Sequence, residues 1–154
     1  MDFSGTVEIE APRAAVWDLL LDFEQLAQCG PGVQSIERLD ATHAQVRAKI
    51  GVGFMTLGFT IDLELVEVEA PDRAVIKATG TAPGNQAEAH GRMHLSGPPE
   101  GPTTMAYDAT VELFGSLAGV GSRMIEGTAG KLIDQTFDCV RARLSPASPA
   151  APAA

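Results

Sequence analysis

Residues 114–140, FGSLAGVGSRMIEGTAGKLIDQTFDCV, carry the pattern that decides the fold. In the second half of this stretch and just beyond it, mostly apolar residues recur every three or four positions, as on the buried face of an amphipathic helix: Ile125, Ala129, Leu132, Ile133, Thr136, Phe137, Val140 and Leu144. The first half is rich in glycines, each of which costs about 1 kcal/mol relative to alanine inside a helix: Gly119, Gly121, Gly127 and Gly130. The stretch therefore predicts one long helix whose first half lies beside another backbone or a bound molecule.

The composition of the chain predicts a single domain and excludes several classes of partner. With 154 residues, 45% of them hydrophobic, the chain can bury a sizeable core. Its net charge of -9 opposes binding to nucleic acid and simple adsorption to anionic lipid. We expect no transmembrane helix and no signal peptide, because no run of about 18 apolar residues occurs and the chain opens on a polar–apolar alternation.

The two cysteines, Cys29 and Cys139, lie far apart in the sequence and lack the spacing of a redox or metal-binding motif. Isolated cysteines are typical of proteins kept in a reducing cytoplasm. We therefore expect two free thiols, with a disulfide between them as the less favoured alternative.

Upstream of the long helix, the sequence predicts a strand followed by two short helices. Polar and apolar residues alternate over residues 2–10, as in a half-buried strand. Pro12 suits the first turn of the helix that follows. Asp22 and Gln25 have the spacing of a capping box, which predicts a second helix over residues 23–28.

A break at Cys29-Gly30-Pro31-Gly32 separates the short helices from a region in which the period changes to two. The apolar phase slips after Leu65, which predicts a β-bulge there. Short turns join the segments, so we expect an antiparallel meander of about seven strands. The clearest alternations run over residues 44–50, 55–65, 74–79, 87–95 and 105–113.

These patterns predict an α+β fold in which a seven-stranded sheet curls around the C-terminal helix, a helix-grip arrangement with the order β-αα-β6-α over residues 1–144. The Pro- and Ala-rich residues 145–154 predict a disordered tail. Small residues on the inner face of the sheet would face a glycine-rich helix: Ala48, Ala89, Gly91 and Ala109. Because voids in packed interiors are costly, we expect the resulting space to be a binding cavity.

The predicted wall of this cavity combines aromatic, aliphatic and methionine side chains. Methionine fills irregular space around flexible ligands, although each methionine taken alone also fits an ordinary core. The hydroxyl of Tyr107 needs a partner, either a ligand carbonyl or a backbone carbonyl. The candidate residues are Trp17, Leu20, Met55, Leu57, Phe59, Ile61, Met93, Met105, Tyr107, Leu117, Val120, Gly121, Met124 and Ile125.

The chain offers little for catalysis or for metal binding. It lacks the motifs of nucleophilic hydrolases and of phosphate-binding loops, so we expect no enzymatic activity. His90 and His94 share one strand face, where a four-residue spacing puts them about 13 Å apart, too far to bind one metal ion. Arg123 has two interpretations: it contacts a polar group at the cavity mouth, or it pairs with Glu126 on the surface.

The order of elements resembles the START and birch-pollen-allergen superfamily, and two segments are similar to the CoxG family, named for a subunit of carbon monoxide dehydrogenase: APRAAVWDLLLDFEQLAQCGPGVQSIERL and LFGSLAGVGSRMIEGTAGKLIDQTF. The strand pattern between them is similar as well. The family's Pro-Gly after the second helix is matched by Pro31 and Gly32. Its G-x-L-A-x-x-G entry to the last helix, followed by a basic residue, is matched by Gly115, Leu117, Ala118, Gly121 and Arg123. Gly30 departs from the family, in which we expect an aliphatic residue there, and we expect the membrane-associating end of some relatives to be absent or reduced in this chain.

The resemblance implies an accessory protein of a molybdenum-hydroxylase-type oxidase, without a covalent cofactor. Such a protein would carry menaquinone or another isoprenoid quinone in its cavity, or help to recruit the oxidase to the membrane. It would be cytoplasmic or peripheral at the inner face of the membrane, with transient membrane contact. Pro31, Gly32, Gly115 and Arg123 would lie at the cavity mouth.

Two alternatives remain open. One is an enzyme similar to polyketide cyclases and aromatases, for which Tyr107, Asp108 and the three histidines are the candidate residues. Strand alternation directs Asp108 outward and leaves Tyr107 almost alone, which is little for acid–base catalysis. The other alternative is a docking module for an oxidase that binds no ligand.

Overall fold

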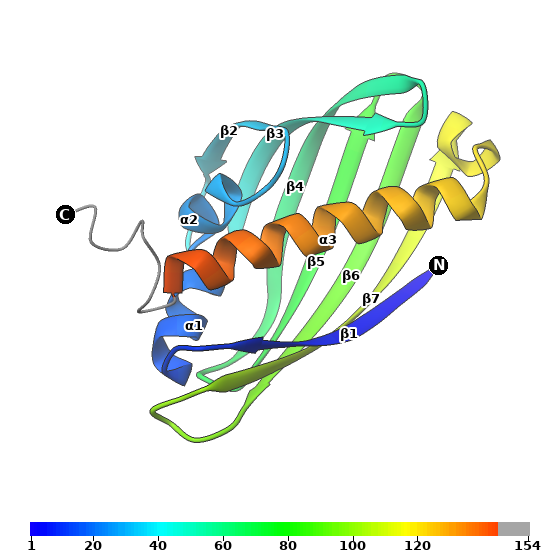
Figure 1. The fold of residues 1–154 in the computed structure, drawn as a ribbon. Coiled ribbons are helices and arrows are strands. Elements are labelled where there is room, and N and C mark those ends of the chain that lie inside the picture. Colours follow the sequence, from blue (N-terminus) through cyan, green and yellow to red (C-terminus); the bar gives the residue numbers. More distant parts are fainter. Residues whose placement is uncertain (145–154) are drawn as a thin grey trace.

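The computed structural model describes residues 1–144. It contains a curved antiparallel sheet of seven strands, with the long helix α3 lying across its concave face (Figure 1). This arrangement confirms the predicted α+β helix-grip fold. The predicted tail, residues 145–154, lies outside the described residues. The elements are β1 (Asp2–Ile9), α1 (Arg13–Leu21), α2 (Phe23–Gln28), β2 (Val33–Arg38), β3 (His43–Val52), β4 (Met55–Glu69), β5 (Arg73–Ala82), β6 (Asn85–Ser96), β7 (Thr103–Gly115), the 3-10 helix η1 (Ser116–Gly119) and α3 (Ser122–Leu144).

The strands lie in the order β1-β7-β6-β5-β4-β3-β2, so β2 to β7 form a meander and β1 pairs with the last strand. The predicted bulge is confirmed, because the β4–β5 register shifts between Leu65 and Glu67. The alternation of polar and apolar residues did not predict strand β2. Its register with β3 is irregular between Val33 and Ser35, which interrupts the alternation of inward and outward residues.

Asp22 separates the two short helices and caps the second, as predicted. Its carboxylate accepts hydrogen bonds from the backbone N–H groups of Glu24 (3.1 Å) and Gln25 (3.2 Å). The Gln25 side chain departs from the capping box, because its amide donates to the Asp22 carboxylate at 2.9 Å. This side-chain hydrogen bond is the main reason that the pKa of Asp22 lies below its ordinary value.

The prediction of one helix from residue 114 to residue 140 is wrong in its first third. Strand β7 continues to Gly115, η1 follows, and α3 begins only at Ser122. Gly115 (φ 83°) and Gly121 (φ 108°) adopt left-handed backbone conformations that favour glycine. A Cβ atom at Gly115 would also collide with the carbonyl oxygen of Gly84. These glycines therefore shape the connection into the helix and do not weaken the helix itself.

Helix α3 is held near its two ends by two separate hydrophobic clusters. Val140 belongs to the first, which also contains residues of α1, β1, β6 and β7. Ile125 belongs to the second, together with Val52, Phe59 and Leu117. Between these clusters, residues of α3 and of the facing strands are only half-buried: Ala129, Leu132, Ile133, Thr136, Leu63, Ile76, Ala78, Ala89, Gly91 and Ala109. The middle of the helix therefore lies over an incompletely filled apolar space.

Cys29 and Cys139 form a disulfide, which corrects the expectation of free thiols. Cys29 caps the C-terminal end of α2, and Cys139 lies in the last third of α3. Packing of these helices brings the two Cα atoms to 5.4 Å, although 110 residues separate them in the sequence. Such proximity depends on tertiary structure and leaves no signal in local spacing.

Met105→Ala should lower the free energy of unfolding by about 2–5 kcal/mol, because it removes a large side chain from a packed core. Met105 is 1% exposed and belongs to the first cluster. Met55→Ala is the matched control, since Met55 is 38% exposed and its loss should cost no more than about 0.5 kcal/mol. Urea unfolding of both variants measures the difference, and equal effects would contradict the assignment of Met105 to the core.

Replacing both cysteines, Cys29→Ala with Cys139→Ala, should lower the free energy of unfolding by about 2–5 kcal/mol, because the disulfide closes a long loop in the unfolded chain. Dithiothreitol should destabilise the wild-type protein and leave the double variant unaffected. A thiol-reactive reagent should find no free thiol in the native protein before reduction. Two reactive thiols in the untreated protein would contradict the structure.

Candidate functional site

The space beneath α3 opens on both flanks of the helix. The first opening, here called the apolar cavity, has a volume of about 230 Å³ and lies between α3, the short helices and the inner face of β5, β6 and β7. Apolar side chains make most of its wall: Leu20, Leu26, Ala74, Ile76, Met93, Met105, Ala109, Ile133 and Phe137.

Small residues on neighbouring strands create the volume of the apolar cavity. Gly91 pairs with Ile76 on one side and with Ala109 on the other, so the three residues form one row across the inner face of the sheet. A Cβ atom added at Gly91 would meet no heavy atom within 4 Å. The same holds for Gly127 and Gly130 on α3, where the helix borders open space and no backbone approaches closely.

Tyr107 and Phe137 join the sheet to the helix at the wall of this cavity. Their rings are tilted by 32° with centroids 5.6 Å apart. The Tyr107 hydroxyl lies over Gly5, where an added Cβ atom would be 2.8 Å from the oxygen. Within residues 1–144 this hydroxyl makes no hydrogen bond, so the backbone carbonyl, one of its two predicted partners, is not found in the described chain. It is a polar group that a ligand carbonyl can use.

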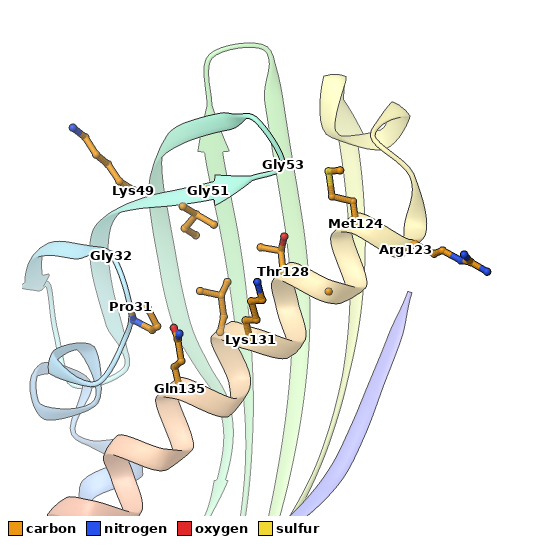
Figure 2. Close-up of a pocket in the computed structure, with 13 residues that line it drawn as sticks. Pro31, Gly32, Lys49, Gly51, Gly53, Arg123, Met124, Thr128, Lys131 and Gln135 are labelled. Carbon is orange, nitrogen blue, oxygen red and sulfur yellow. The ribbon is translucent and has the colours of Figure 1, made fainter.

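The second opening, here called the flank groove, has a volume of about 520 Å³ and lies between α3, β3 and the loop after α2 (Figure 2). Its wall comprises Pro31, Gly32, Lys49, Ile50, Gly51, Gly53, Arg123, Met124, Gly127, Thr128, Lys131, Leu132 and Gln135. Gly32 (φ 78°) allows the loop to lie directly on β3, where the Lys49 N–H donates to the Gly32 carbonyl at 2.9 Å. This contact explains the need for glycine after Pro31.

The structure distributes the predicted cavity residues over several places. Leu20, Met93, Met105 and Tyr107 line the apolar cavity, and Met124 lines the flank groove with Pro31, Gly32 and Arg123. The second core cluster and its margin hold Leu57, Phe59, Ile61, Leu117, Val120 and Ile125, and the first holds Trp17. Gly121, Leu117 and Ile125 border a further opening beside η1. Met55 is exposed at the β3–β4 hairpin, and Gly115 lies at the end of β7.

The set of cavity residues predicted from the sequence lacks several that line the apolar cavity: Leu26, Ile76, Gly91, Ala109, Ile133 and Phe137. The sequence identifies Gly91 and Ala109 as small inward residues, and Ile133 and Phe137 as part of the apolar face of α3. Local patterns do not provide the register that aligns them. Leu26 reaches the cavity through the packing of α2, which no spacing in the sequence indicates.

Titratable side chains are nearly absent from the interior of the apolar cavity. Arg92 and Asp108 at its edge pair with each other, Nη2 to Oδ1 at 2.7 Å, and their side chains are 68% and 50% exposed. His90 and His94 are exposed. Among residues 1–144 no group of three or more His, Cys, Asp or Glu side chains is placed to hold a metal ion. Within the same residues, no helix combines the length and the apolar character needed to cross a membrane.

Solved structures confirm the fold. A conserved protein from Geobacillus kaustophilus is 22% identical, with a TM-score of 0.87 and coverage of 94% of this chain and 95% of that chain. A START superfamily protein from Mycobacterium smegmatis is 16% identical (TM-score 0.71; coverage 93% and 96%). The Zhui aromatase/cyclase from Streptomyces sp. R1128 is 18% identical (TM-score 0.62; coverage 96% and 97%). No curated protein matches the chain.

The sequence profile of one family, CoxG, covers residues 5–145, almost all of the part that the structure describes. The match includes both segments that carry the resemblance, from the short helices to the end of α3. The chain belongs to the CoxG family, which takes its name from a subunit of carbon monoxide dehydrogenase.

Proposed function

We propose that the protein binds an isoprenoid quinone, such as menaquinone, between α3 and the concave face of the sheet. The observation that carries the proposal is the half-buried apolar surface in the middle of α3 and on the strands below it. A ligand that covers about 400 Å² of apolar surface gains about 10 kcal/mol, from which association costs of at least about 4 kcal/mol are subtracted. The difference, at most about 6 kcal/mol, corresponds to a dissociation constant of about 40 μM or weaker from this surface alone, which suits a carrier that must also release its ligand.

The dimensions and chemistry of the two openings support a ligand with a ring and a long apolar tail. The apolar cavity, at about 230 Å³, is smaller than the roughly 300–1,000 Å³ of typical ligand pockets. A quinone ring would occupy it, with one carbonyl accepting a hydrogen bond from the Tyr107 hydroxyl. The prenyl tail would then follow the space beneath α3 toward the flank groove. Leu132 and Ile133, adjacent in α3, line the groove and the cavity respectively.

We further propose that the protein serves a carbon monoxide dehydrogenase-type molybdenum hydroxylase as an accessory that carries quinone and performs no catalysis itself. Membership of the CoxG family supports this role. The direct test is to immobilise the protein and measure retention of the purified hydroxylase complex, with and without bound quinone. Electron transfer from the hydroxylase to quinone should also accelerate when the loaded protein is added.

An aromatase or cyclase function is the second candidate, because Zhui shares the fold. General acid–base catalysis needs a positioned proton donor or acceptor near the substrate. Tyr107 is the titratable residue inside the apolar cavity, since Arg92 and Asp108 are engaged with each other at its edge. The contents of the cavity therefore favour carriage over catalysis.

Gly91→Leu should fill the apolar cavity and lower quinone affinity at least tenfold while the fold survives. Gly91 has no positive φ, so a side chain is compatible with its backbone, and open space surrounds its Cβ position. Gly58→Leu is the matched control, because Gly58 is exposed on strand β4 and its Cβ position is also unobstructed. Quenching of Trp17 fluorescence by a short-chain menaquinone analogue measures the affinity. Equal affinities for the two variants would contradict the proposed site.

Tyr107→Phe should weaken quinone binding about fivefold, the value of one hydrogen bond worth about 1 kcal/mol. The free energy of unfolding should change by less than about 0.5 kcal/mol, because the hydroxyl has no partner within residues 1–144. The same fluorescence titration and urea unfolding measure the two quantities. Unchanged affinity would mean that the hydroxyl does not contact the ligand.

A further inference from the structure

The end of the molecule formed by the β3–β4 hairpin and the first turn of α3 exposes a cluster of large apolar side chains. Phe54, in the two-residue turn of the hairpin, is 106% exposed, and the adjacent Met55 is 38% exposed. Met124 on α3 is 42% exposed and reaches toward this turn, so that a Cβ atom at Gly53 would lie 2.6 Å from its sulfur (Figure 2). Three of the seven large exposed apolar residues within residues 1–144 thus lie at one end. Isolated exposed apolar residues are ordinary, but such a cluster is typical of an interaction surface.

The flank groove beside this cluster is lined by basic residues, although the chain as a whole is acidic. The chain has 20 acidic and 11 basic residues, yet the groove is lined by Lys49, Arg123 and Lys131 and by no acidic residue. Lys49 and Arg123 extend outward on opposite sides of the opening (Figure 2). None of the three cations forms an ion pair within residues 1–144. Arg123 forms no ion pair with Glu126, its alternative partner, within residues 1–144.

We propose that this end, comprising Phe54, Met55, Met124 and the three cations, is the surface that docks on an anionic phospholipid bilayer. Aromatic and methionine side chains enter the boundary between headgroups and acyl chains, while lysine and arginine contact the anionic headgroups. The combination fits a bilayer better than an acidic protein, because a fully exposed Phe54 needs an apolar environment that a charged protein surface lacks. The proposal rests on the proposed function, since the groove then gives an apolar ligand a path between the bilayer and the space beneath α3.

This docking surface is compatible with the acidic net charge of the chain. The net charge of -9 opposes adsorption of the chain to anionic lipid as a whole. Electrostatic interactions at physiological salt decay over about 8 Å, so the charges at the contacting surface dominate. The protein should therefore bind in one orientation, with the hairpin toward the bilayer and its acidic surfaces directed away.

The apolar part of the surface is tested by co-sedimentation with phosphatidylcholine vesicles that contain or lack phosphatidylglycerol. The wild-type protein should bind the vesicles with phosphatidylglycerol, and Phe54→Ser should bind them about tenfold more weakly, the effect of losing one buried aromatic side chain. Leu39→Ser is the matched control. Leu39 is 55% exposed but lies in the β2–β3 turn, at the opposite end of β3 from the hairpin. Equal binding of the two variants would overturn the proposal.

The charged part is tested with a triple variant, Lys49→Gln, Arg123→Gln and Lys131→Gln, which should weaken vesicle binding about fivefold for each charge at low salt. The control removes three other cations, Arg73, Lys77 and Arg143, which form no ion pair within residues 1–144. It should bind nearly as the wild type does. Equal losses for the two triple variants, or equal wild-type binding with and without phosphatidylglycerol, would overturn the role of the cations.

Failure of this surface is distinguishable from failure of the quinone site. Phe54→Ser should still take up a short-chain quinone analogue from solution, while its uptake of menaquinone from vesicles should slow. A wild-type protein that binds the analogue but no vesicles would overturn the docking surface and leave the carrier function intact. Vesicle binding without quinone uptake would support the surface and overturn the carrier. If Phe54→Ser instead lost only its retention of the hydroxylase, the surface would be a protein interface and the proposal would be wrong.

Discussion

The structure depends on the way in which α3 is held over the sheet. Two hydrophobic clusters fix the helix, one through Val140 and the other through Ile125, and the turns between them lack a complete core beneath them. A helix of 23 residues is long enough to cross the sheet from one cluster to the other. Because the clusters stabilise the position of the helix, the residues of α3 between them need not pack in a core. The cavity and the groove are consequences of this two-point attachment.

The glycines divide into two groups with different physical roles. Gly115 and Gly121 have positive φ angles and set the path from β7 into α3, which explains why glycine occupies both positions. Leu117 between them is buried, and its N–H donates to the Asn85 side chain at 2.8 Å, so the connection is anchored as well as turned. Gly91, Gly127 and Gly130 instead provide open space on the strand and the helix.

The architecture was accessible from the sequence because each element carries its own period. The capped helix after Asp22, the bulge after Leu65 and the apolar face of α3 all follow from local chemistry. The site was accessible only in part. Whether an inward methionine packs in the core, as Met105 does, or emerges at a rim, as Met55 does, depends on what the rest of the fold places opposite it. The Cys29–Cys139 disulfide likewise depends on tertiary structure and could not be predicted from local sequence.

The disulfide has a mechanical consequence for α3. It ties the last third of the helix covalently to α2, whereas the first turn is joined to β7 through Gly121, whose backbone rotates more freely than that of other residues. A helix tied covalently at one end and held at the other by packing alone moves most at the end held by packing. Any widening of the space under α3 is therefore greatest beside the β3–β4 hairpin and smallest near the short helices.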